Sequence, residues 1–574
     1  MGKKRLKARR RFRSPTVLFA ALHLQAEDIS TAGMREAPVN QLPPELLIRI
    51  FSQIDDPCPN ASNDGDNWQT IGHGTRWPVV LRVCKYWYDA ACDAPLLWQH
   101  IQAYTKPDWL RLSLQRSKTA LVDVTLRSCQ GYAAAIPLLI DHADRLRTLA
   151  TLDSEHGGFH LLKRLLLLEL PNLKELRIAG EEYAEDDDHV NLKPPLGHWP
   201  SIRVLRLTHL VLPVKSAIFG SLRVLDLAYM HDVPKMSTMP LDFALTVLEA
   251  CHELQELKLN GVFPKLVGES EILVSLPHLR RLEVTSHIGP TPRWPFPMSS
   301  LVSNMLLRHV QLPLHAALKF VSQVKASTPV GYRSFIPPED PSYIPILHHA
   351  TFACLRHDSF LCSEPGGGTL EVTVEFDGED EPWFNQDRQL VDMSFLLARA
   401  PITHLSLVSA RLYSESISIA FGTFSGLTTL EFSTVPTHDG EDEDWRFPAL
   451  FSSLLLPREA HVRGASAPTD ESDEEFRARL PLRTLCVLRF NALLWESRVL
   501  GLVFACLYAR FALGAPRLSE LYVAMYGGEA GDIDRTEKHD EEIEMLESLV
   551  DGPVVYEDCE PPVSLSPRRF TLVA

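Results

Sequence analysis

The six residues "LRVLDL", at positions 222–227, carry the pattern that decides the fold. An apolar residue is followed by two others, then by Leu, one other residue and a further apolar residue. The last three positions alternate, as in a β-strand with one buried face. We expect the leading apolar residue to anchor the turn before the strand. Because one such unit cannot bury its own apolar face, several units must stack around a shared core.

Copies of this pattern recur between residues 110 and 530. The other clear copies are "LKELRI" (173–178), "IRVLRL" (202–207), "LQELKL" (254–259), "LRRLEV" (279–284), "ITHLSL" (402–407), "LTTLEF" (427–432) and "LSELYV" (518–523); the weaker ones are "LVDVTL" (121–126), "LLRHVQL" (306–312) and "LRTLCV" (482–487). Segments typical of helices lie between them, such as "LDFALTVLEACHEL" (241–254). A single copy of the pattern is also common in Leu-rich helices. Eight clear copies, however, predict an α/β fold, namely an irregular leucine-rich-repeat solenoid with one strand and one helix per repeat.

The charge distribution argues against nucleic acid as a partner. The 574-residue chain has a net charge of -16, yet its first thirteen residues, "MGKKRLKARRRFR", contain only basic charges. The rest is therefore strongly acidic and should repel phosphate. The ten cysteines are scattered without a CxxC motif, which is typical of reduced thiols inside a cell. The sequence contains no stretch of 18 apolar residues, so no membrane span is predicted.

The chain is expected to have four parts. They are a basic disordered arm (1–38), a small helical domain (39–104) with an insertion at 55–76, the solenoid (110–530), and an acidic, Pro-rich tail or cap (531–574). Acidic runs at 181–189, 439–444 and 470–475 are expected to form solvated loops on the solenoid, with Ser472 a candidate phosphorylation site. The basic arm is either a nuclear localisation signal or a solvated or membrane-surface arm, so we expect a cytoplasmic or nuclear location.

The small domain should contain three short helices. The first lies in "LPPELLIRIFSQI" (42–54), where a Pro pair suits the first turn and apolar residues form one broad stripe. The second begins at Trp77 and Pro78, and the third lies in "APLLWQHI" (94–101). So few ordered residues bury little surface, yet their apolar stripes are wide. We therefore expect the surplus apolar surface to face a partner, either the solenoid or another protein.

This domain resembles the F-box family, especially the form common in fungal proteins. The family pattern is LPxEll..If, then V-C/S-x-x-W, then P-x-LW. The matching residues are Leu42, Pro43, Glu45, Leu46, Leu47, Ile50, Phe51, Val83, Cys84, Trp87, Pro95, Leu97 and Trp98. Most F-boxes join their first two helices by a short loop, so the insertion at 55–76 is a departure that could crowd the binding surface.

The resemblance implies binding to the Skp-type adaptor of a cullin–RING (SCF-type) ubiquitin ligase, with the repeats holding the target protein. The residues expected to bind the adaptor are Leu42, Pro43, Leu46, Leu47, Ile50, Phe51, Val80, Val83, Cys84, Trp87, Leu97 and Trp98. The chain would then be a substrate receptor and not an enzyme. The alternative is a repeat scaffold with no ubiquitin role, whose helices merely cap the solenoid.

Candidate chemistry elsewhere in the sequence is weak. Cys354, His357 and Cys362 supply three zinc ligands at most, with the His pair at 348–349 as a doubtful fourth. His156 and His160 are separated by two glycines, which disfavour the helix that a shared metal would need. The Gly-rich "EPGGGTL" (364–370) lacks the Lys of a phosphate loop and predicts a turn. The sequence therefore predicts no cofactor and no catalytic site.

Overall fold

The computed structural model describes residues 41–54, 77–103, 107–127, 129–151, 159–179, 199–208, 218–228, 241–261, 271–287, 298–325, 331–336, 343–377, 386–408, 412–433, 446–455, 480–494, 499–526 and 543–558. The predicted basic arm, the insertion at 55–76 and the three acidic runs lie outside these residues. The chain divides into two compact units, residues 1–236 with 250–254 and residues 237–249 with 255–574.

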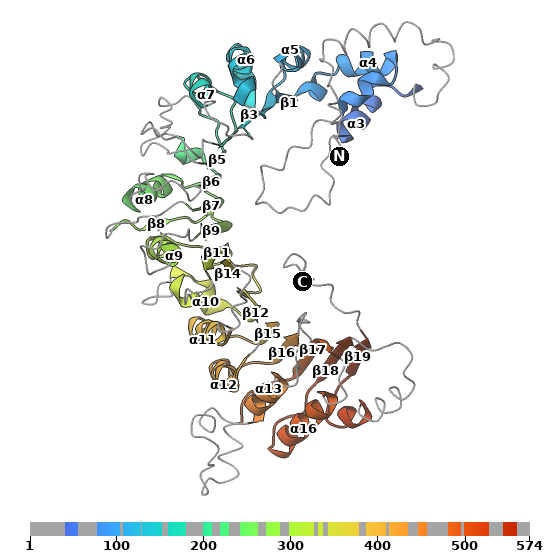
Figure 1. The fold of residues 1–574 in the computed structure, drawn as a ribbon, viewed down its shortest axis with the longest axis vertical. Helices are drawn as coiled ribbons and strands as arrows, with labels where there is room; N and C mark the ends of the chain where they lie inside the picture. The colour runs from blue at the N-terminus through green and yellow to red at the C-terminus, as the bar shows by residue number, and fades with distance from the viewer. Residues whose placement is uncertain are drawn as a thin grey trace, which may run out of the picture. The chain divides into compact units, whose positions relative to one another are not determined.

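The first unit begins with short helices and continues as a parallel sheet. The helices are α3 (Pro44–Gln53), the 3-10 helix η3 (Trp77–Arg82), α4 (Lys85–Cys92) and the 3-10 turn η4 (Pro95–Trp98). The sheet consists of β1 (His100–Ala103), β2 (Val122–Leu126), β3 (Leu146–Thr151), β4 (Glu175–Ala179), β5 (Val204–Thr208) and β6 (Val224–Ala228), each parallel to the next. The crossovers contain α5 (Pro107–Arg116), α6 (Cys129–Ile140), η5 (Ala143–Arg145), α7 (Phe159–Leu166) and η6 (Phe219–Ser221). Figure 1 shows α5, α6 and α7 along one side of these strands; none of the described helices lies along the other side, which we call the uncovered face.

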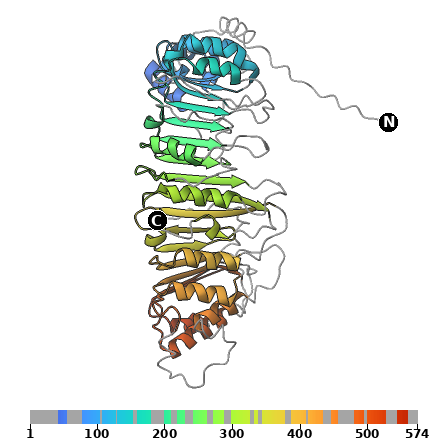
Figure 2. The same cartoon turned by 90° about the vertical axis from the view of Figure 1, so that its left-hand side faces the viewer.

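The second unit repeats this arrangement with more strands. They are β7 (Glu256–Asn260), β9 (Arg281–His287), β11 (Ala317–Lys325), β14 (Thr369–Asp377), β13 (Ser359–Ser363), β12 (Phe352–Leu355), β15 (His404–Val408), β16 (Thr429–Ser433), β17 (Val487–Leu494), β18 (Glu520–Tyr526) and β19 (Val554–Asp558), in their order across the sheet. Its helices are α8 (Leu241–Ala250), α9 (Met298–His309), η7 (Tyr332–Ser334), α10 (Ile346–His349), α11 (Gln386–Leu396), α12 (Ser414–Thr423), α13 (Arg446–Leu455) and α16 (Val499–Ala512). A short pair, β8 (Val274–Ser275) and β10 (Val310–Gln311), lies apart from the main sheet. In Figure 2 the green-to-brown helices of this unit lie in front of its strands.

One excursion breaks the regular order of this sheet. β13 runs antiparallel to both β12 and β14, so the chain places β14 beside β11 and β12 beside β15. The turn between β13 and β14 is the predicted turn in "EPGGGTL". Gly367 there has a φ of +100°, a conformation that favours glycine. A Cβ on Gly368 would collide with the backbone carbonyl of Leu314, so this turn requires glycine at both positions.

The repeated sequence pattern is confirmed as a strand pattern. In every clear copy the last three positions lie in, or at the start of, a parallel strand, and all three apolar residues are buried. Leu176 and Ile178 of β4 are fully buried, and so is Leu173, which anchors the turn before the strand. These turns also stack, since the backbone N–H groups of Arg203 and Val204 both donate to the carbonyl of Lys174. The chain is therefore an α/β protein with a large parallel sheet.

Two of the weaker copies were placed wrongly. Residues 306–312 fall mainly in α9 and β10, and the next long strand is β11, where Leu318 and Phe320 are buried. In the copy at 482–487, Val487 is only partly buried. The buried residues are Leu485, Leu488 and Phe490, so the correct register starts three residues later.

The sheet also extends beyond the range 110–530 predicted for it. β1 lies within the range assigned to the small domain, and β19 lies within the range assigned to the tail. In the described ranges, no helix combines the length and the apolar character that a membrane crossing would require.

Candidate functional site

Helix α3 presents apolar side chains in two directions. Pro44 occupies its first turn, where backbone N–H groups have no helical partner, and Glu45 follows in the same turn. Leu47 and Phe51 lie one helical turn apart and are fully buried. Leu46 and Ile50, rotated by one position, are 46% and 42% exposed. The broad apolar stripe in the sequence is thus half core and half surface.

The second predicted helix is divided in two. The chain forms η3, passes through Cys84 in an extended conformation with φ −160° and ψ 169°, and then begins α4. Trp77 and Val80 of η3 are buried. Val83 precedes the break and is 48% exposed. The break changes which residues of this segment reach the surface, because the two pieces do not share one helical stripe.

The third predicted helix is only the turn η4. It ends at Trp98, and the expected helical residue Ile101 lies instead in β1, which pairs with β2. Pairing of β1 with β2 therefore ends the helical turn before Ile101, which the sequence had placed in a helix. The indole Nε1 of Trp98 donates to the carbonyl oxygen of Ala91 at 2.9 Å, which fixes the turn beneath α4.

Aromatic rings build the core of this small domain, which we call the N-terminal module (residues 41–54 and 77–98). Trp77 and Trp98 meet edge to face at 4.8 Å between centroids, and Phe51 lies 5.0 Å from Trp87. Trp98 also lies 5.4 Å from Trp109 of α5. The module and the first crossover helix therefore share a core, and part of the apolar surplus is used inside the chain.

The rest of the surplus forms an exposed apolar set. Its members are Leu46, Ile50, Val79, Val83, Tyr86 and Leu96, of which Leu96 is 66% exposed. They come from α3, η3, the break before α4, α4 itself and η4. The phenol of Tyr86 donates to the carbonyl oxygen of Leu42 at 2.7 Å, which ties the start of α4 to the residues before α3. So many exposed large apolar side chains in so small a module are typical of an interaction surface.

Burial divides the residues predicted to bind the adaptor. Pro43, Leu46, Ile50 and Val83 are exposed, and Leu42, Cys84 and Trp87 are partly buried, whereas Leu47, Phe51, Val80, Leu97 and Trp98 are buried in the module core. Burial places these last five side chains in the core, where they support the module surface from within, and the adaptor-binding role of the whole set stays a prediction. Three further exposed apolar side chains of the module, Val79, Tyr86 and Leu96, were not among the predicted residues. The sequence signal that could have indicated Val79 is its four-residue spacing from Val83.

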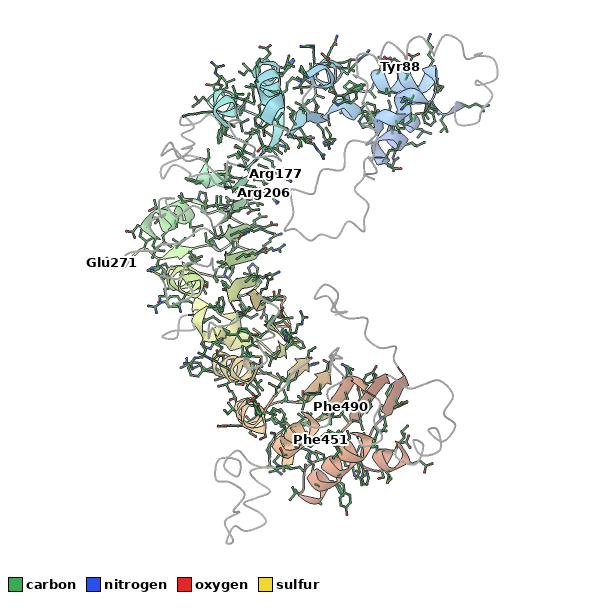
Figure 3. The ribbon with its side chains drawn as sticks, viewed as in Figure 1. Tyr88, Arg177, Arg206, Glu271, Phe451 and Phe490 are labelled. Atoms are coloured by element: carbon green, nitrogen blue, oxygen red, sulfur yellow. The ribbon has the colours of Figure 1, made fainter. Side chains whose placement is uncertain are left out.

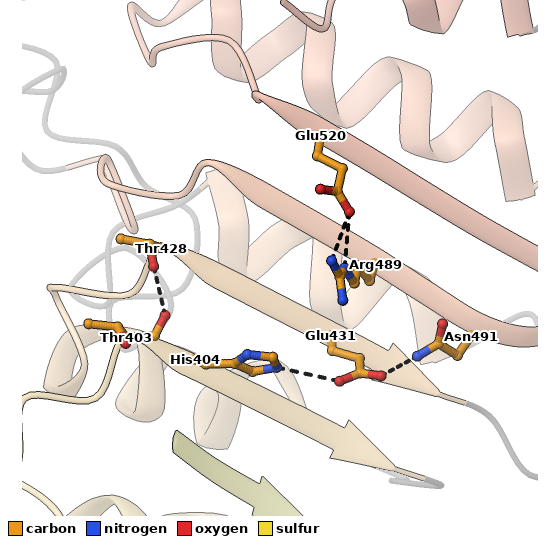
Figure 4. Close-up of polar contacts among 7 residues, drawn as sticks. All are labelled: Thr403, His404, Thr428, Glu431, Arg489, Asn491 and Glu520. Atoms are coloured by element: carbon orange, nitrogen blue, oxygen red, sulfur yellow. Dashed lines mark hydrogen bonds and ion pairs between the residues drawn. The ribbon is translucent and has the colours of Figure 1, made fainter. Parts of the chain in front are cut away.

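The uncovered face of the parallel sheet carries polar side chains. Figure 4 shows one region, in which His404 Nε2 lies 3.4 Å from Glu431 and Asn491 also donates to Glu431. The contact with His404 lowers the pKa of Glu431. On the next strands Arg489 pairs with Glu520 at 2.9 Å. Charges in this region therefore neutralise one another.

The candidate zinc ligands do not converge. Cys354 on β12 and Cys362 on β13 occupy alternate positions of an antiparallel pair, so they point to opposite faces of the sheet. Burial raises the pKa of Cys362 to about 12, so its thiol stays protonated. Among the residues described, no three His, Cys, Asp or Glu side chains group as a metal site. His156 lies outside the described residues, and nothing is described of the side chain of His160.

The N-terminal module has a counterpart among known families. Residues 39–102 match the F-box-like family model. The matched range contains α3, η3, α4 and η4 and ends inside β1, which supports an F-box protein. F-box domains bind Skp-type adaptors in cullin–RING ligases, and F-box proteins are typically non-catalytic substrate receptors. No curated protein matches the chain.

Proposed function

We propose that this chain is the substrate-recognition subunit of an SCF-type cullin–RING ubiquitin ligase. The F-box-like module would bind the Skp-type adaptor, and the strand array, which we interpret as an irregular leucine-rich-repeat solenoid, would bind a target protein. Ubiquitin transfer would be performed by the other ligase subunits, and this chain would contribute proximity. A cytoplasmic or nuclear location fits this role, with the basic arm as a candidate nuclear signal.

The exposed apolar set of the module is the observation that carries the proposal. Leu46 and Ile50 repeat at helical spacing on α3, and Val83 and Tyr86 bracket the start of α4. Their exposure has no use in an isolated soluble chain, whereas burial against a partner releases roughly 25 cal/mol per Å² of apolar surface. An amphipathic helix that presents such a stripe suits helix-in-groove recognition. Leu47 and Phe51 would hold α3 in place from the inside.

The runner-up is a repeat scaffold without a role in ubiquitin transfer, in which the module only caps the sheet. The ring contact between Trp98 and Trp109 favours it, because a cap must share its core with the first repeat. A cap does not need Leu46, Val83 and Leu96 on its surface, however, and this difference separates the two functions.

A pull-down with a Skp-type adaptor tests the proposal. The wild-type chain should capture the adaptor as well as an established F-box protein does in the same assay. The double variant Leu46→Ala/Val83→Ala should lose capture while its circular dichroism and melting temperature stay unchanged. Leu273→Ala is the matched control, since Leu273 is 60% exposed and lies outside the module.

Three outcomes would contradict the adaptor role or the surface assigned to it. A wild-type chain that does not bind, although the established F-box protein does, would favour the scaffold. Capture that survives the double variant would place the adaptor elsewhere on the chain. Loss of capture by Leu273→Ala would likewise remove the support for the module surface.

A further inference from the structure

Two arginines lie directly opposite each other on the uncovered face of the first unit. Arg177 of β4 and Arg206 of β5 are register partners in parallel strands. Arg177 lies between the buried residues Leu176 and Ile178, so its side chain points away from the core. Figure 3 labels both side chains at the strands from which they arise. Neighbouring strands are about 4.8 Å apart, and like charges placed directly opposite destabilise a sheet.

The acids near this pair leave much of its hydrogen-bonding capacity unused. Arg177 donates through Nε to Glu175 at 2.6 Å. Arg206 Nη1 is 3.8 Å from Asp226, too far for a hydrogen bond, and the buried Nε of Arg206 has no partner within the described part of the chain. A buried guanidinium N–H without an acceptor is rare in folded proteins and calls for a water or a ligand.

Two other arginines, one in each unit, have their donors better satisfied. Arg147 makes two hydrogen bonds to Asp123, and Arg489 makes two to Glu520. The pair at 177 and 206 differs from these two arginines in both respects, because each of its members has a like charge as a cross-strand neighbour and Arg206 has an unsatisfied donor. An oxyanion between the two guanidinium groups would remove both defects, because the planar fork of Arg matches carboxylate and phosphate oxygens.

We propose that Arg177 and Arg206 bind an anionic side chain of the target protein, either a carboxylate or a phosphorylated hydroxyl group. This inference rests on the proposed function and specifies the chemistry of its target. Charge complementarity supports it. The chain as a whole carries -16, so an acidic segment is repelled by most of it and attracted to a site where cations are adjacent. The side chains are only 21% and 20% exposed, and such shelter strengthens an ionic contact.

Peptide binding to the intact chain tests this site. The probes are three fluorescent degenerate peptide libraries whose fixed central residue is phosphoserine, glutamate or serine, and the readout is anisotropy. The phosphoserine or the glutamate library should bind at least about tenfold tighter than the serine library, and binding should weaken with added salt. The comparison between the two anionic libraries distinguishes phosphate from carboxylate recognition.

Variants then place the binding at the pair. Arg177→Gln/Arg206→Gln should reduce affinity for the preferred library by about tenfold or more, to the level of the serine library. Arg177→Lys/Arg206→Lys keeps the charge but lacks the fork, so it should show an intermediate loss. Two controls should keep wild-type affinity: Arg164→Gln, an exposed arginine on α7, and Arg489→Gln, a paired arginine on β17. Melting temperatures show whether each variant is folded.

Three results would overturn the inference. The first is equal affinity of the wild-type chain for all three libraries, and the second is unchanged binding by the folded Gln/Gln variant. The third is binding that emerges only after the acids at 185–188 are replaced by Asn and Gln, because the chain's own acidic run would then be the occupant. The adaptor pull-down is run on the same preparations. Adaptor capture without peptide discrimination defeats this inference alone, whereas peptide discrimination without capture defeats the ligase role and leaves the site on a scaffold.

Discussion

Arg147 on β3 donates two parallel hydrogen bonds to the carboxylate of Asp123 on β2, from Nε to Oδ1 at 2.9 Å and from Nη2 to Oδ2 at 2.6 Å. A bulge makes this possible. Asp123 pairs in register with Thr148, so Arg147 is an extra residue in β3. His100 of β1 approaches the same carboxylate at 3.0 Å. Burial by itself would raise the pKa of Asp123, but the hydrogen bonds from Arg147, His100 and Thr148 outweigh it and hold that pKa well below its ordinary value of 3.8.

We predict that Asp123→Asn lowers the unfolding free energy at pH 7 by about 1–3 kcal/mol, because it leaves Arg147 without its ionic partner. The pKa of Asp123 is lower in the folded than in the unfolded chain. Its contribution is therefore present above pH 3.8 and is lost as the pH falls through the folded pKa. Urea unfolding followed by circular dichroism should show a wild-type advantage at pH 7 that shrinks with acidification below pH 3.8.

The control for this prediction is Asp108→Asn. Asp108 pairs with Arg111 on the surface of α5, where half or more of each side chain is exposed. Its loss should change stability by less than about 0.5 kcal/mol. An Asp123 effect that is no larger than this, or one that is independent of pH, would contradict the role assigned to the pair.

Adjacent leucines of α3 should respond in opposite ways to the same truncation. Leu47 is fully buried, so Leu47→Ala should destabilise the N-terminal module by about 2–5 kcal/mol. Leu46 is 46% exposed, and Leu46→Ala should cost less than about 0.5 kcal/mol. Hydrogen exchange of the α3 amides measures both. Similar loss of protection in the two variants would show that the two faces of α3 are not divided as described.

Substitution of glycine by alanine should have opposite effects on stability at Gly368, where the backbone is crowded, and at Gly422, where there is open space. Gly368→Ala forces its Cβ against the carbonyl of Leu314, and backbone cannot move aside as a flexible side chain can, so we expect a lower melting temperature. Gly422 is an exposed glycine of α12, where a Cβ would meet nothing. Gly422→Ala should stabilise the chain by about 0.5–1 kcal/mol through helix propensity. Calorimetric melting of both variants tests the pair, and a stabilising Gly368→Ala would refute the close approach.

The strands could be predicted because their signal is local and repeated. The alternation of apolar and other residues is visible within each copy, such as "LKELRI", and the apolar positions of each clear copy are the ones that the parallel strands bury. The excursion through β12, β13 and β14 could not be predicted this way. The residues of β12 and β13 do not show the alternation of a repeat strand, and only pairing across the sheet decides that β13 runs antiparallel to its neighbours. The copy at 482–487 failed for a related reason, since two registers with Leu at the right spacing overlap there.

The sequence indicated which segment of the chain holds the candidate surface, but not which of its residues are exposed. The apolar excess between Leu42 and Trp98 indicated a partner surface. Which half of the stripe faces outward depends on tertiary packing, because Leu47 and Phe51 turn toward the tryptophan core. Helical spacing alone also could not place the break at Cys84, since a 3-10 turn followed by a short α-helix keeps almost the same apolar spacing.

Arg510 of α16 gives the last prediction, from a residue to which no sequence pattern points. It is 4% exposed and donates to three carbonyl oxygens, those of Leu454 at 2.7 Å, Pro481 at 3.0 Å and Leu482 at 2.9 Å. Leu482 has a φ of +49°, which a non-glycine residue rarely adopts, and the hydrogen bond from Arg510 holds its carbonyl in place. The side chain thus joins the end of α13 to the segment that precedes β17.

We expect Arg510→Met to lower the unfolding free energy by on the order of 3 kcal/mol, because three buried carbonyls lose their donor. Arg510→Lys should fall between this variant and the wild type, since one ammonium group cannot reach all three acceptors in the geometry of the fork. Arg517→Met is the comparison, for Arg517 is partly exposed, lies 4.8 Å from the ring of Phe511 and should cost less than about 1 kcal/mol. Urea unfolding ranks the three variants. If Arg510→Met is as stable as Arg517→Met, the buried guanidinium does not hold these segments together.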